Sequence, residues 1–387
     1  VKLRKEGKFM IYLNNAATSS PKPEAVYDKV NNFFRESAFN ASRSGTGSTN
    51  STVREIFAVR EKMADFFKIQ DSSKLVFNSG ATESLNTVIK GVLEEGDQVI
   101  TSRLEHNSVL RPLRRLRAEK DIEIAFVDFD KSGEVNYQQL ENSIQNNTKL
   151  IVLSHASNVL GTVNDLAELS KIARKAGVLL LIDAAQTAGV IDINLKELDI
   201  DFMAFAGHKS LFGPPGIGAL YVKDHRYLLP LKEGGTGSDS LSTAQPEVMP
   251  DYLEAGTPNS IGIAGLGAGI DYIQKEGRKN IHQKELKLLE RLLKGLKTLA
   301  GVKIYGSFKL KKRTAVTAFN LDSRSSNQIA FELENKYKIE VRAGLHCAPL
   351  LHQSLGTLDQ GMLRVSPGYF NTEEEIDRFL NVIQSII

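Results

Sequence analysis

Lys209 is the residue whose chemistry stands out first in the sequence. It follows His208 in the segment Ala206-Gly207-His208-Lys209-Ser210, between apolar runs at 201–205 and 218–222 that indicate short buried strands. An enclosed lysine loses hydration unless it is paired or neutralised, and a neutral amine can attack a carbonyl, as Schiff-base chemistry requires. The alternative is a lysine that leaves a strand end for solvent, and Lys209 taken alone favours that alternative.

Asp183 is a second polar residue in an apolar setting. It ends the run Val178-Leu179-Leu180-Leu181-Ile182, whose lack of alternation indicates a strand buried on both faces. A carboxylate at the end of such a strand is costly unless it meets a positive partner, and a protonated heterocyclic nitrogen would be one. Gln186, three residues further on, could then reach a ring oxygen beside that nitrogen.

Other turns carry polar residues at predicted strand ends. Gly80-Ala81-Thr82 opens a helix, where backbone N–H groups and a threonine hydroxyl suit a phosphate, although an ordinary helix cap is the alternative. His106, after Glu105, could stack on a planar ring or could be a capped surface histidine. Asn158 lies on the turn 154–161, where structural asparagines are common.

These residues supply a phosphate seat, a ring-stacking residue, a carboxylate for a ring nitrogen, an amide for a ring oxygen and a lysine for an aldehyde. This is the inventory that pyridoxal 5'-phosphate (PLP) needs. Each piece comes from a different predicted element, so coincidence is a poor explanation. The sequence therefore predicts PLP as the cofactor and no metal site.

Cys347 is the one cysteine of the chain. A free cysteine is most often a small buried hydrophobe, and a metal site with His346 and His352 would have loosely spaced ligands. A nucleophile needs an exposed, electropositive setting, which Arg342 and His346 could provide. Arg364 could offer its planar guanidinium to an amino-acid carboxylate, although a surface arginine is the alternative.

Strands and helices alternate through the N-terminal part of the chain, which predicts βαβ units and a mainly parallel, buried sheet. Ligands of such sheets bind at the carboxyl ends of the strands, where most of the polar residues above are expected. The expected strands are 75–77, 98–100, 122–129, 150–153 and 178–182, and the expected helices are 24–36, 53–67, 109–117 and 165–175.

The pattern changes near residue 266, where a lysine-rich amphipathic helix, three strands and a closing helix follow. We therefore expect a large domain over 11–265 and a smaller α+β domain over 266–387, with about 1–25 packing on the small domain. The elements expected in the small domain are the helix 275–298, the strands 302–305, 315–320 and 339–342, and the helix 373–386.

Four segments do not fit regular elements. The glycine-rich runs 213–218 and 265–269 lack the residues of phosphate and dinucleotide loops, and we interpret them as packing and turn glycines. The polar stretch 40–52 is either a linker or a functional loop over a site. The loop 234–250 could form a lid or a dimer contact.

Composition narrows the function classes. The chain has 387 residues and a formal net charge of +3, which is too small to indicate binding to nucleic acid or to an anionic membrane. No apolar run is long enough to cross a bilayer, and the basic start lacks the apolar segment of a signal peptide. A single cysteine excludes an internal disulfide framework, so we expect a cytoplasmic protein.

Six segments of the chain form a set. They are Glu105-His106, Ser157-Asn158-Val159-Leu160-Gly161-Thr162, Ile182-Asp183-Ala184-Ala185-Gln186-Thr187, Phe205-Ala206-Gly207-His208-Lys209, Glu254-Ala255-Gly256-Thr257-Pro258-Asn259 and Arg342-Ala343-Gly344-Leu345-His346-Cys347-Ala348-Pro349. Together they resemble the class V aminotransferase-fold PLP enzymes, and most closely the group II cysteine desulfurase and selenocysteine lyase branch. The resemblance runs from about Ile11 to the C-terminus. It implies an α/β, fold-type I PLP-dependent transferase with a mainly parallel seven-stranded sheet and a smaller α+β C-terminal domain.

The resemblance also implies roles for individual residues. Lys209 would bond to the cofactor aldehyde, Asp183 would pair with the pyridine nitrogen, and Gln186 would contact the ring hydroxyl. His106 would stack on the ring. The whole implied cofactor-binding set is Ala81, Thr82, His106, Asn158, Asp183, Gln186, His208, Lys209 and Thr257.

The phosphate is the least complete part of this set. Thr82 and His208 would seat it, helped by Thr257 of a second subunit, which implies a homodimer with shared active sites. Ala206 stands where such enzymes often have a serine that donates to the phosphate. Losing one neutral hydrogen bond costs about 0.5–1.5 kcal/mol, unless Ser210 or the loop around residue 44 replaces it.

The activity that the resemblance implies is cysteine desulfuration, with Lys209, Cys347 and His106 as catalytic residues. L-cysteine would bind through Arg364, Arg342 and Asn158, and its sulfur would pass to Cys347 as a persulfide while L-alanine leaves. A sulfur-acceptor protein, for example in iron–sulfur cluster assembly, would take the sulfur on. The alternatives are a selenocysteine lyase, another PLP-dependent amino-acid lyase or aminotransferase, and a sulfur-handling scaffold without turnover.

Overall fold

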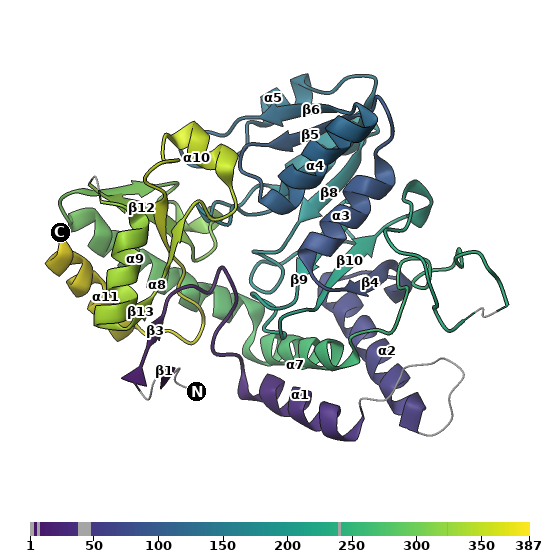
Figure 1. Ribbon diagram of the computed structural model, residues 1–387, viewed down its shortest axis with the longest axis horizontal. Coiled ribbons are helices and arrows are strands. Elements are labelled where there is room, and N and C mark those ends of the chain that lie inside the picture. The colour runs from purple at the N-terminus through teal and green to yellow at the C-terminus, as the bar shows by residue number, and fades with distance from the viewer. Residues whose placement is uncertain (1–3, 6–7, 38–47, 239–240, 323) are drawn as a thin grey trace.

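The computed structural model describes residues 4–5, 8–37, 48–238, 241–322 and 324–387, which form two lobes (Figure 1). The larger lobe surrounds a seven-stranded sheet, and the smaller lobe is built on a four-stranded antiparallel sheet. No helix within these ranges is long and apolar enough to cross a membrane. A short antiparallel pair near the N-terminus consists of β1 (Arg4–Lys5) and β2 (Lys8–Phe9).

The large sheet consists of β4 (Leu75–Asn78), β5 (Gln98–Ser102), β6 (Glu123–Val127), β7 (Thr148–Ser154), β8 (Leu179–Asp183), β9 (Phe202–Ala206) and β10 (Gly218–Val222). Their spatial order is β4-β10-β9-β8-β7-β5-β6. Strand β10 runs antiparallel to both of its neighbours, and the other neighbouring pairs are parallel. The expected mainly parallel, seven-stranded sheet is confirmed.

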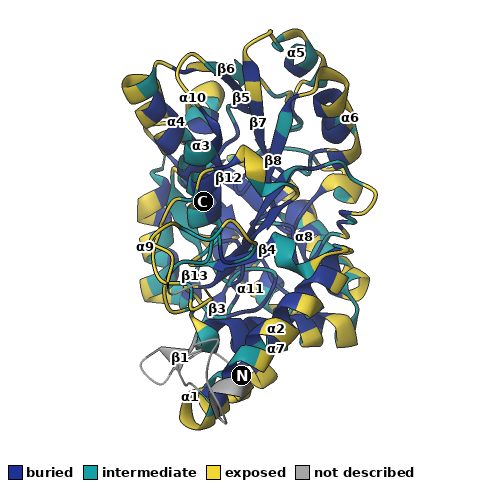
Figure 2. Ribbon diagram, turned by 90° about the vertical axis from the view of Figure 1, so that its right-hand side faces the viewer, coloured by how far each residue is buried: buried dark blue, intermediate teal, exposed yellow. Residues whose placement is uncertain are grey.

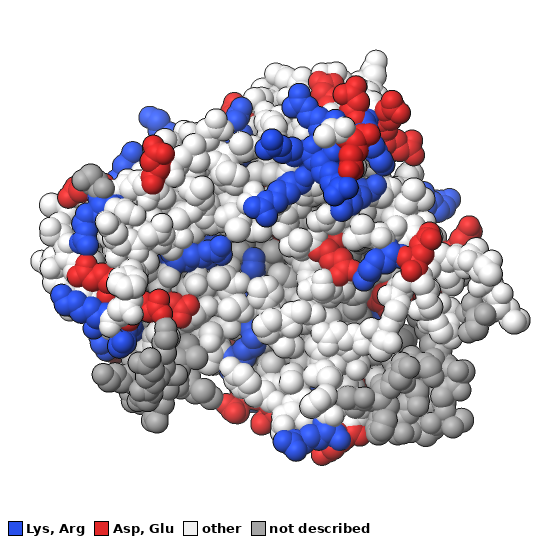
Figure 3. Space-filling model, viewed as in Figure 1, with Lys and Arg blue, Asp and Glu red and all other residues white. Residues whose placement is uncertain are grey.

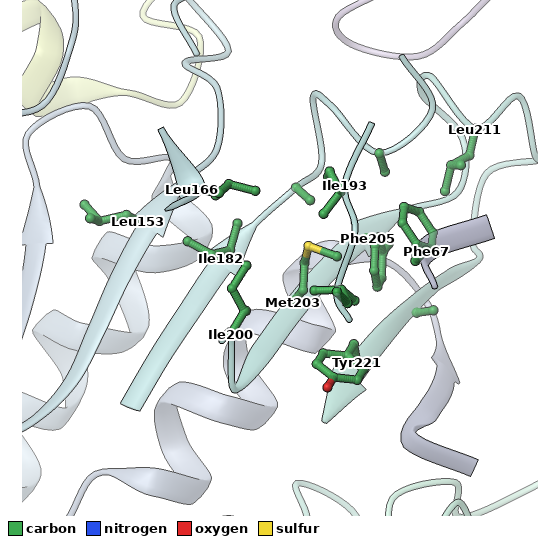
Figure 4. Packing of buried hydrophobic residues seen from close by; sticks show 14 of the residues in the cluster. Phe67, Leu153, Leu166, Ile182, Ile193, Ile200, Met203, Phe205, Leu211 and Tyr221 are labelled. Atoms are coloured by element: carbon green, nitrogen blue, oxygen red, sulfur yellow. The ribbon is translucent and has the colours of Figure 1, made fainter. Parts of the chain in front are cut away.

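Helices cover both faces of this sheet, and its strands are largely buried between them, except for the partly exposed edge strand β6 (Figure 2). Successive strand residues point to opposite faces, so Leu181 packs on one side whereas Ile182 joins the cluster around Met203 and Phe205 on the other (Figure 4). The first face is covered by α3 (Ala81–Val92) and α4 (Asn107–Lys120). The second is covered by α2 (Ser48–Phe67), α5 (Tyr137–Asn142), α6 (Leu166–Ala176) and α7 (Ser260–Glu276), with α1 (Glu24–Glu36) outside α7.

The smaller lobe has a core of its own, formed where its helices pack on its sheet. Its strands are β11 (Val302–Tyr305), β12 (Thr317–Leu321), β13 (Ile339–Glu340), β14 (Arg342–Gly344) and β15 (Met362–Val365). Its helices are α8 (Arg278–Thr298), α9 (Ser326–Tyr337), α10 (Pro349–Leu355) and α11 (Glu373–Ile386). Single 3-10 turns occur at Ser72–Lys74, His225–Tyr227 and Leu310–Lys312.

The chain joins the two lobes twice. Strand β3 (Ile11–Tyr12) pairs in parallel with β13, and Leu13 lies in the core of the smaller lobe, which supports the expected packing of the N-terminal segment there. The expected boundary between 265 and 266 falls inside α7, whose Leu266 is buried in the core of the larger lobe. We propose Gly277, with φ of +84°, as the boundary, because it separates α7 from α8.

Helix α7 is not among the predicted elements, because its glycines indicate turns. A Cβ on Gly265 would come within 2.7 Å of Val30 of α1, and one on Gly267 within 2.6 Å of Val59 of α2. These glycines therefore serve close helix packing, as interpreted, but within a helix. The predicted helix 275–298 is correspondingly the end of α7 followed by α8.

The polar stretch 40–52 is also partly helical. Residues 48–52 belong to the first turns of α2, so the predicted start of that helix at residue 53 is too late. Residues 40–47, including the loop around residue 44, lie outside the described residues.

Candidate active site

A cavity of about 160 Å³ lies at the carboxyl ends of β7, β8 and β9. Figure 3 shows the molecular surface hollowed between the two lobes. The cavity brings together eight of the residues singled out in the sequence: Ala81, Thr82, His106, Asn158, Asp183, Gln186, His208 and Lys209. The expectation that the polar strand-end residues converge is therefore confirmed by the topology, because parallel strands place their carboxyl ends at one edge.

Lys209 and Asp183 are coupled electrostatically across this cavity. Asp183 is buried, and its Oδ1 accepts a hydrogen bond from the backbone N–H of Ala185 at 2.9 Å. Burial raises the pKa of Asp183, and the positive charge of Lys209 opposes that change. Burial lowers the pKa of Lys209 to about 8, although Asp183 acts in the opposite direction. A lysine with this pKa has a substantial neutral fraction near pH 8, as an amine nucleophile requires.

Helix α3 begins at the cavity without a side-chain cap. Its N-cap residue is Gly80, whose φ of +142° suits glycine, and a Cβ at that position would meet no atom within 4 Å. Thr82 does not cap its own helix, since its Oγ1 lies 2.8 Å from the Oγ of Ser108. The uncapped helix start leaves N–H groups available to an anion.

His106 is the N-cap residue of α4, where its Nδ1 accepts a hydrogen bond from the backbone N–H of Ser108 at 3.1 Å. Because a backbone N–H can only donate, the ring proton of neutral His106 is on Nε2. Burial and the nearby charge of Lys209 lower the pKa of His106 to about 4. His106 therefore caps a helix and lines the cavity as a neutral ring, and its stacking on a planar ring stays a prediction.

Glu105 is a site residue whose environment the sequence does not reveal. It is fully buried and accepts hydrogen bonds from the Oγ of Ser102 at 2.6 Å and from the Oγ and backbone N–H of Ser154. Burial, with a smaller contribution from Asp183, raises the pKa of Glu105 to about 7. The Glu105 carboxyl group thereby links the ends of β5 and β7, and His106 is the next residue in the chain.

Arg364 lies beside the cavity rather than on the protein surface. Its Nη1 donates to the backbone oxygen of Asn158 at 3.0 Å, and its Nη2 donates to Oδ1 of Asn14 at 3.0 Å. The side chain is buried, and its Nε has no hydrogen-bond partner among the described residues. The alternative of a surface arginine is therefore wrong.

Cys347 belongs to a loop that the smaller lobe extends toward the cavity. The backbone oxygen of Cys347 accepts from the backbone N–H of Asn107 at 2.7 Å, and Nδ2 of Asn158 donates to the backbone oxygen of His346 at 2.8 Å. Nη2 of Arg342 lies 3.6 Å from the sulfur. Cys347 is partly exposed, so the alternative of a fully buried hydrophobe is wrong.

Thr257 lies apart from the other predicted residues. It lines a second cavity, of about 410 Å³, together with Arg60 and Glu254, which form an ion pair at 2.7 Å. Its predicted contact with a second subunit and the resulting homodimer stay predictions. Ser210, the suggested replacement for the missing serine at Ala206, is not among the described residues that line the cavity, and its hydroxyl accepts from the backbone N–H of Gly189.

Fold and site together define a fold-type I PLP enzyme. The chain belongs to the aminotransferase class-V family, whose model matches residues 11–379. Its cofactor is accordingly pyridoxal 5'-phosphate. The residues around the cavity fit this cofactor, because they combine a buried carboxylate, a lysine of lowered pKa and an uncapped helix start with open space at Gly80.

Proteins that are similar to this chain have a more specific name than the family. The chain is 34% identical to a probable cysteine desulfurase of Pyrococcus abyssi, over 98% of this chain and 94% of the relative. It is also 34% identical to a cysteine desulfurase of Cronobacter sakazakii, over 97% of this chain and 92% of the relative. The apo structure of a cysteine desulfurase from Thermococcus onnurineus NA1 superposes with a TM-score of 0.92 at 34% identity, covering 98% of this chain and 94% of that one.

Proposed function

We propose that this chain is a PLP-dependent cysteine desulfurase, which moves sulfur from L-cysteine to Cys347, releases L-alanine and passes the sulfur to an acceptor. The observation that carries the proposal is the attachment of the Cys347 loop to the cavity wall, through the Asn107 and Asn158 hydrogen bonds. These bonds bring the one thiol of the chain next to the pocket that contains Lys209 and Asp183. A different PLP reaction on an amino acid would not require a thiol at this place.

Lys209 is the proton carrier in this proposal. When bound, PLP supplies an electron sink for the charge that develops at the substrate Cα. The lowered pKa of Lys209, about 8, allows its neutral amine to take a proton from Cα and its ammonium form to return one. Asp183, ionised beside a positive partner, keeps that partner protonated.

Arg364 is the proposed substrate carboxylate site. The hydrogen bonds to Asn158 and Asn14 fix the plane of its guanidinium, and its Nε is left without a partner among the described residues. A planar guanidinium binds a carboxylate with charge-assisted hydrogen bonds. A carboxylate there would also satisfy a buried donor, which is costly to leave unpaired.

Cys347 is the proposed nucleophile. Its thiolate forms an S–S bond with the substrate sulfur, the substrate Cβ–S bond breaks, and a proton is added at Cβ. One thiol and one L-cysteine thus give one persulfide and one L-alanine. The guanidinium of Arg342 beside the sulfur is a partner for the negative charge of the thiolate.

His106 contributes as a neutral ring. Its Nδ1 already accepts from Ser108, and its pKa is about 4, so it is a poor acceptor for the proton of the substrate thiol. Stacking on the cofactor ring and donation from Nε2–H are the roles that this environment favours.

The sulfur acceptor is proposed to have an acidic surface. Lys and Arg side chains gather over α4 beside the hollow between the lobes (Figure 3). Arg111, Arg114 and Arg117 are exposed on this helix and form no ion pair with any described residue. An acceptor that reaches Cys347 would cover the start of α4, because Asn107 contacts Cys347.

A product assay tests the function. The purified protein should release L-alanine from L-cysteine and carry a persulfide on Cys347, measured by amino-acid analysis and by intact-protein mass. Cys347→Ala should retain the visible absorbance of the bound cofactor and lose persulfide formation. Sulfur release by this variant at the wild-type rate would exclude Cys347 as nucleophile, and a keto-acid product would exclude desulfuration. Comparing L-selenocysteine with L-cysteine in the same variant distinguishes a selenocysteine lyase.

A further inference from the structure

The hydroxyl groups of the cavity wall differ in what they can still donate. The described residues that line the cavity include four with a hydroxyl: Ser79, Thr82, Ser108 and Ser154. The proton of Ser79 is donated to the carboxylate of Glu83 at 2.6 Å, and that of Ser154 is donated to the carboxylate of Glu105. The remaining pair, Thr82 and Ser108, must therefore provide any hydroxyl donation to an anion in this cavity.

Thr82 and Ser108 have one hydroxyl proton each and lie 2.8 Å apart, so one donates to the other. If Thr82 donates to Ser108, the Thr82 hydroxyl presents only lone pairs to the cavity, and these repel an anion. If Ser108 donates to Thr82, the Thr82 proton is free for the anion. The direction of this single hydrogen bond decides whether the Thr82 hydroxyl can donate to a phosphate.

His106 competes for the proton of Ser108. The Oγ of Ser108 lies 2.9 Å from Nδ1 of His106, and the same Nδ1 accepts from the backbone N–H of Ser108 at 3.1 Å. When the hydroxyl turns away from His106, the backbone N–H still satisfies Nδ1. Turning Ser108 toward Thr82 therefore leaves no buried polar group without a partner, which keeps the change inexpensive.

We propose that Ser108 is a positioning residue of the cofactor site, which donates to Thr82 and thereby directs the Thr82 hydroxyl proton toward the bound phosphate. The proposal rests on the predicted role of Thr82 in binding the phosphate of the cofactor that the proposed function requires. The proposal also gives a reason why the cavity tolerates Ala206, which has no hydroxyl to donate to the phosphate. The Thr82 hydroxyl, oriented by Ser108, donates instead. A donor held by a second hydroxyl is also more strongly polarised than an isolated one.

Dissociation constants for the full-length apoprotein test this role, with PLP, pyridoxal and inorganic phosphate as ligands. Ser108→Ala removes the hydrogen bond that orients and polarises the Thr82 hydroxyl. It should therefore weaken PLP and phosphate binding about 2- to 13-fold, the range for one neutral hydrogen bond, and leave pyridoxal binding unchanged. Ser108→Cys, which keeps the shape but is a weak donor, should show the same selective loss. Ser170→Ala is the matched control. Ser170 is a buried residue of α6 whose hydroxyl is hydrogen-bonded to the backbone of Asp199, away from the cavity.

A double-mutant cycle separates this proposal from the one on which it rests. In a Thr82→Ala background, Ser108→Ala should change phosphate affinity less than twofold, because the two hydroxyls act as one unit. Additive effects, or an equal loss of pyridoxal binding, would overturn the role of Ser108 and leave Thr82 in place. An unchanged phosphate affinity in Thr82→Ala alone would instead remove the phosphate seat, and the role of Ser108 with it.

Discussion

The backbone N–H of Asn107 donates to the backbone oxygen of Cys347 at 2.7 Å, across the two lobes. Asn107 directly follows His106, so this bond places the thiol loop at the rim of the cofactor cavity. The loop is bent sharply there, since His346 and Cys347 have φ of +50° and +59°, in the left-handed region. Residues other than glycine adopt this region at a cost that surrounding contacts must offset. The hydrogen bonds to Asn107 and Asn158 are such contacts.

Replacing Asp183 should change the titration of Lys209. Asp183→Asn removes the negative charge that raises the Lys209 pKa, so this pKa should fall below its value of about 8 in the apoprotein. The pH dependence of Lys209 modification by an amine-specific reagent measures it, with Lys209→Ala to identify the signal. A pKa that rises or stays in place would contradict the coupling of these two residues.

Arg364→Lys should affect substrate binding more than cofactor binding. Lysine keeps the charge but loses the planar pair of donors, and a lost hydrogen bond to a charged group costs about 1.5–3 kcal/mol. We expect KM for L-cysteine to rise at least tenfold, with the cofactor absorbance retained. Arg313→Lys is the control, because Arg313 is equally buried but binds backbone oxygens outside the cavity. Equal changes in KM for both variants would argue against a carboxylate site at Arg364.

Glu105 should make the stability of the apoprotein depend on pH. Burial raises its folded-state pKa from 4.5 to about 7, so the folded state binds more protons than the unfolded state between these values. The contribution of Glu105 to the free energy of unfolding amounts to about 3 kcal/mol. It is fully present below pH 4.5 and is lost as pH rises through about 7. Glu105→Gln should flatten the slope, measured by urea unfolding at pH 5 and pH 7.5. An unchanged slope would mean that Glu105 is ionised throughout.

Charge reversal on α4 should slow sulfur transfer without slowing sulfur loading. Arg114→Glu with Arg117→Glu should reduce transfer from Cys347 to an acidic peptide that carries one cysteine, and added salt should narrow the difference from wild type. Alanine release in a single turnover should be unchanged. Lys287→Glu, exposed on α8 of the smaller lobe, is the control. Faster transfer to the acidic peptide by the variant than by the wild type would refute an acidic acceptor at this surface. Transfer by the wild type to an RNA in preference to the acidic peptide would refute it as well.

Much of the larger lobe could be predicted from the sequence because its signals are local. The apolar run 178–182 has no polar alternation, which indicates a doubly buried strand, and β8 occupies Leu179–Asp183. The sequence also predicts helix 24–36 at the bounds that α1 shows and, in the smaller lobe, helix 373–386 at the bounds of α11. By contrast, α7 is rich in glycine, and its helical form depends on close packing against α1 and α2, which no local pattern encodes.

The chemistry of the site follows from the sequence, because a lysine, a carboxylate, a ring and a helix start come at strand ends, which a parallel sheet must gather at one edge. The way these groups are supported depends on the folded chain. Ser108 between Thr82 and His106, Glu105 between two strands, and the attachment of Cys347 to Asn107 are contacts between segments far apart in the chain. Such contacts follow from packing and hydrogen-bond geometry in three dimensions, whereas residue type and spacing record only what neighbouring positions require.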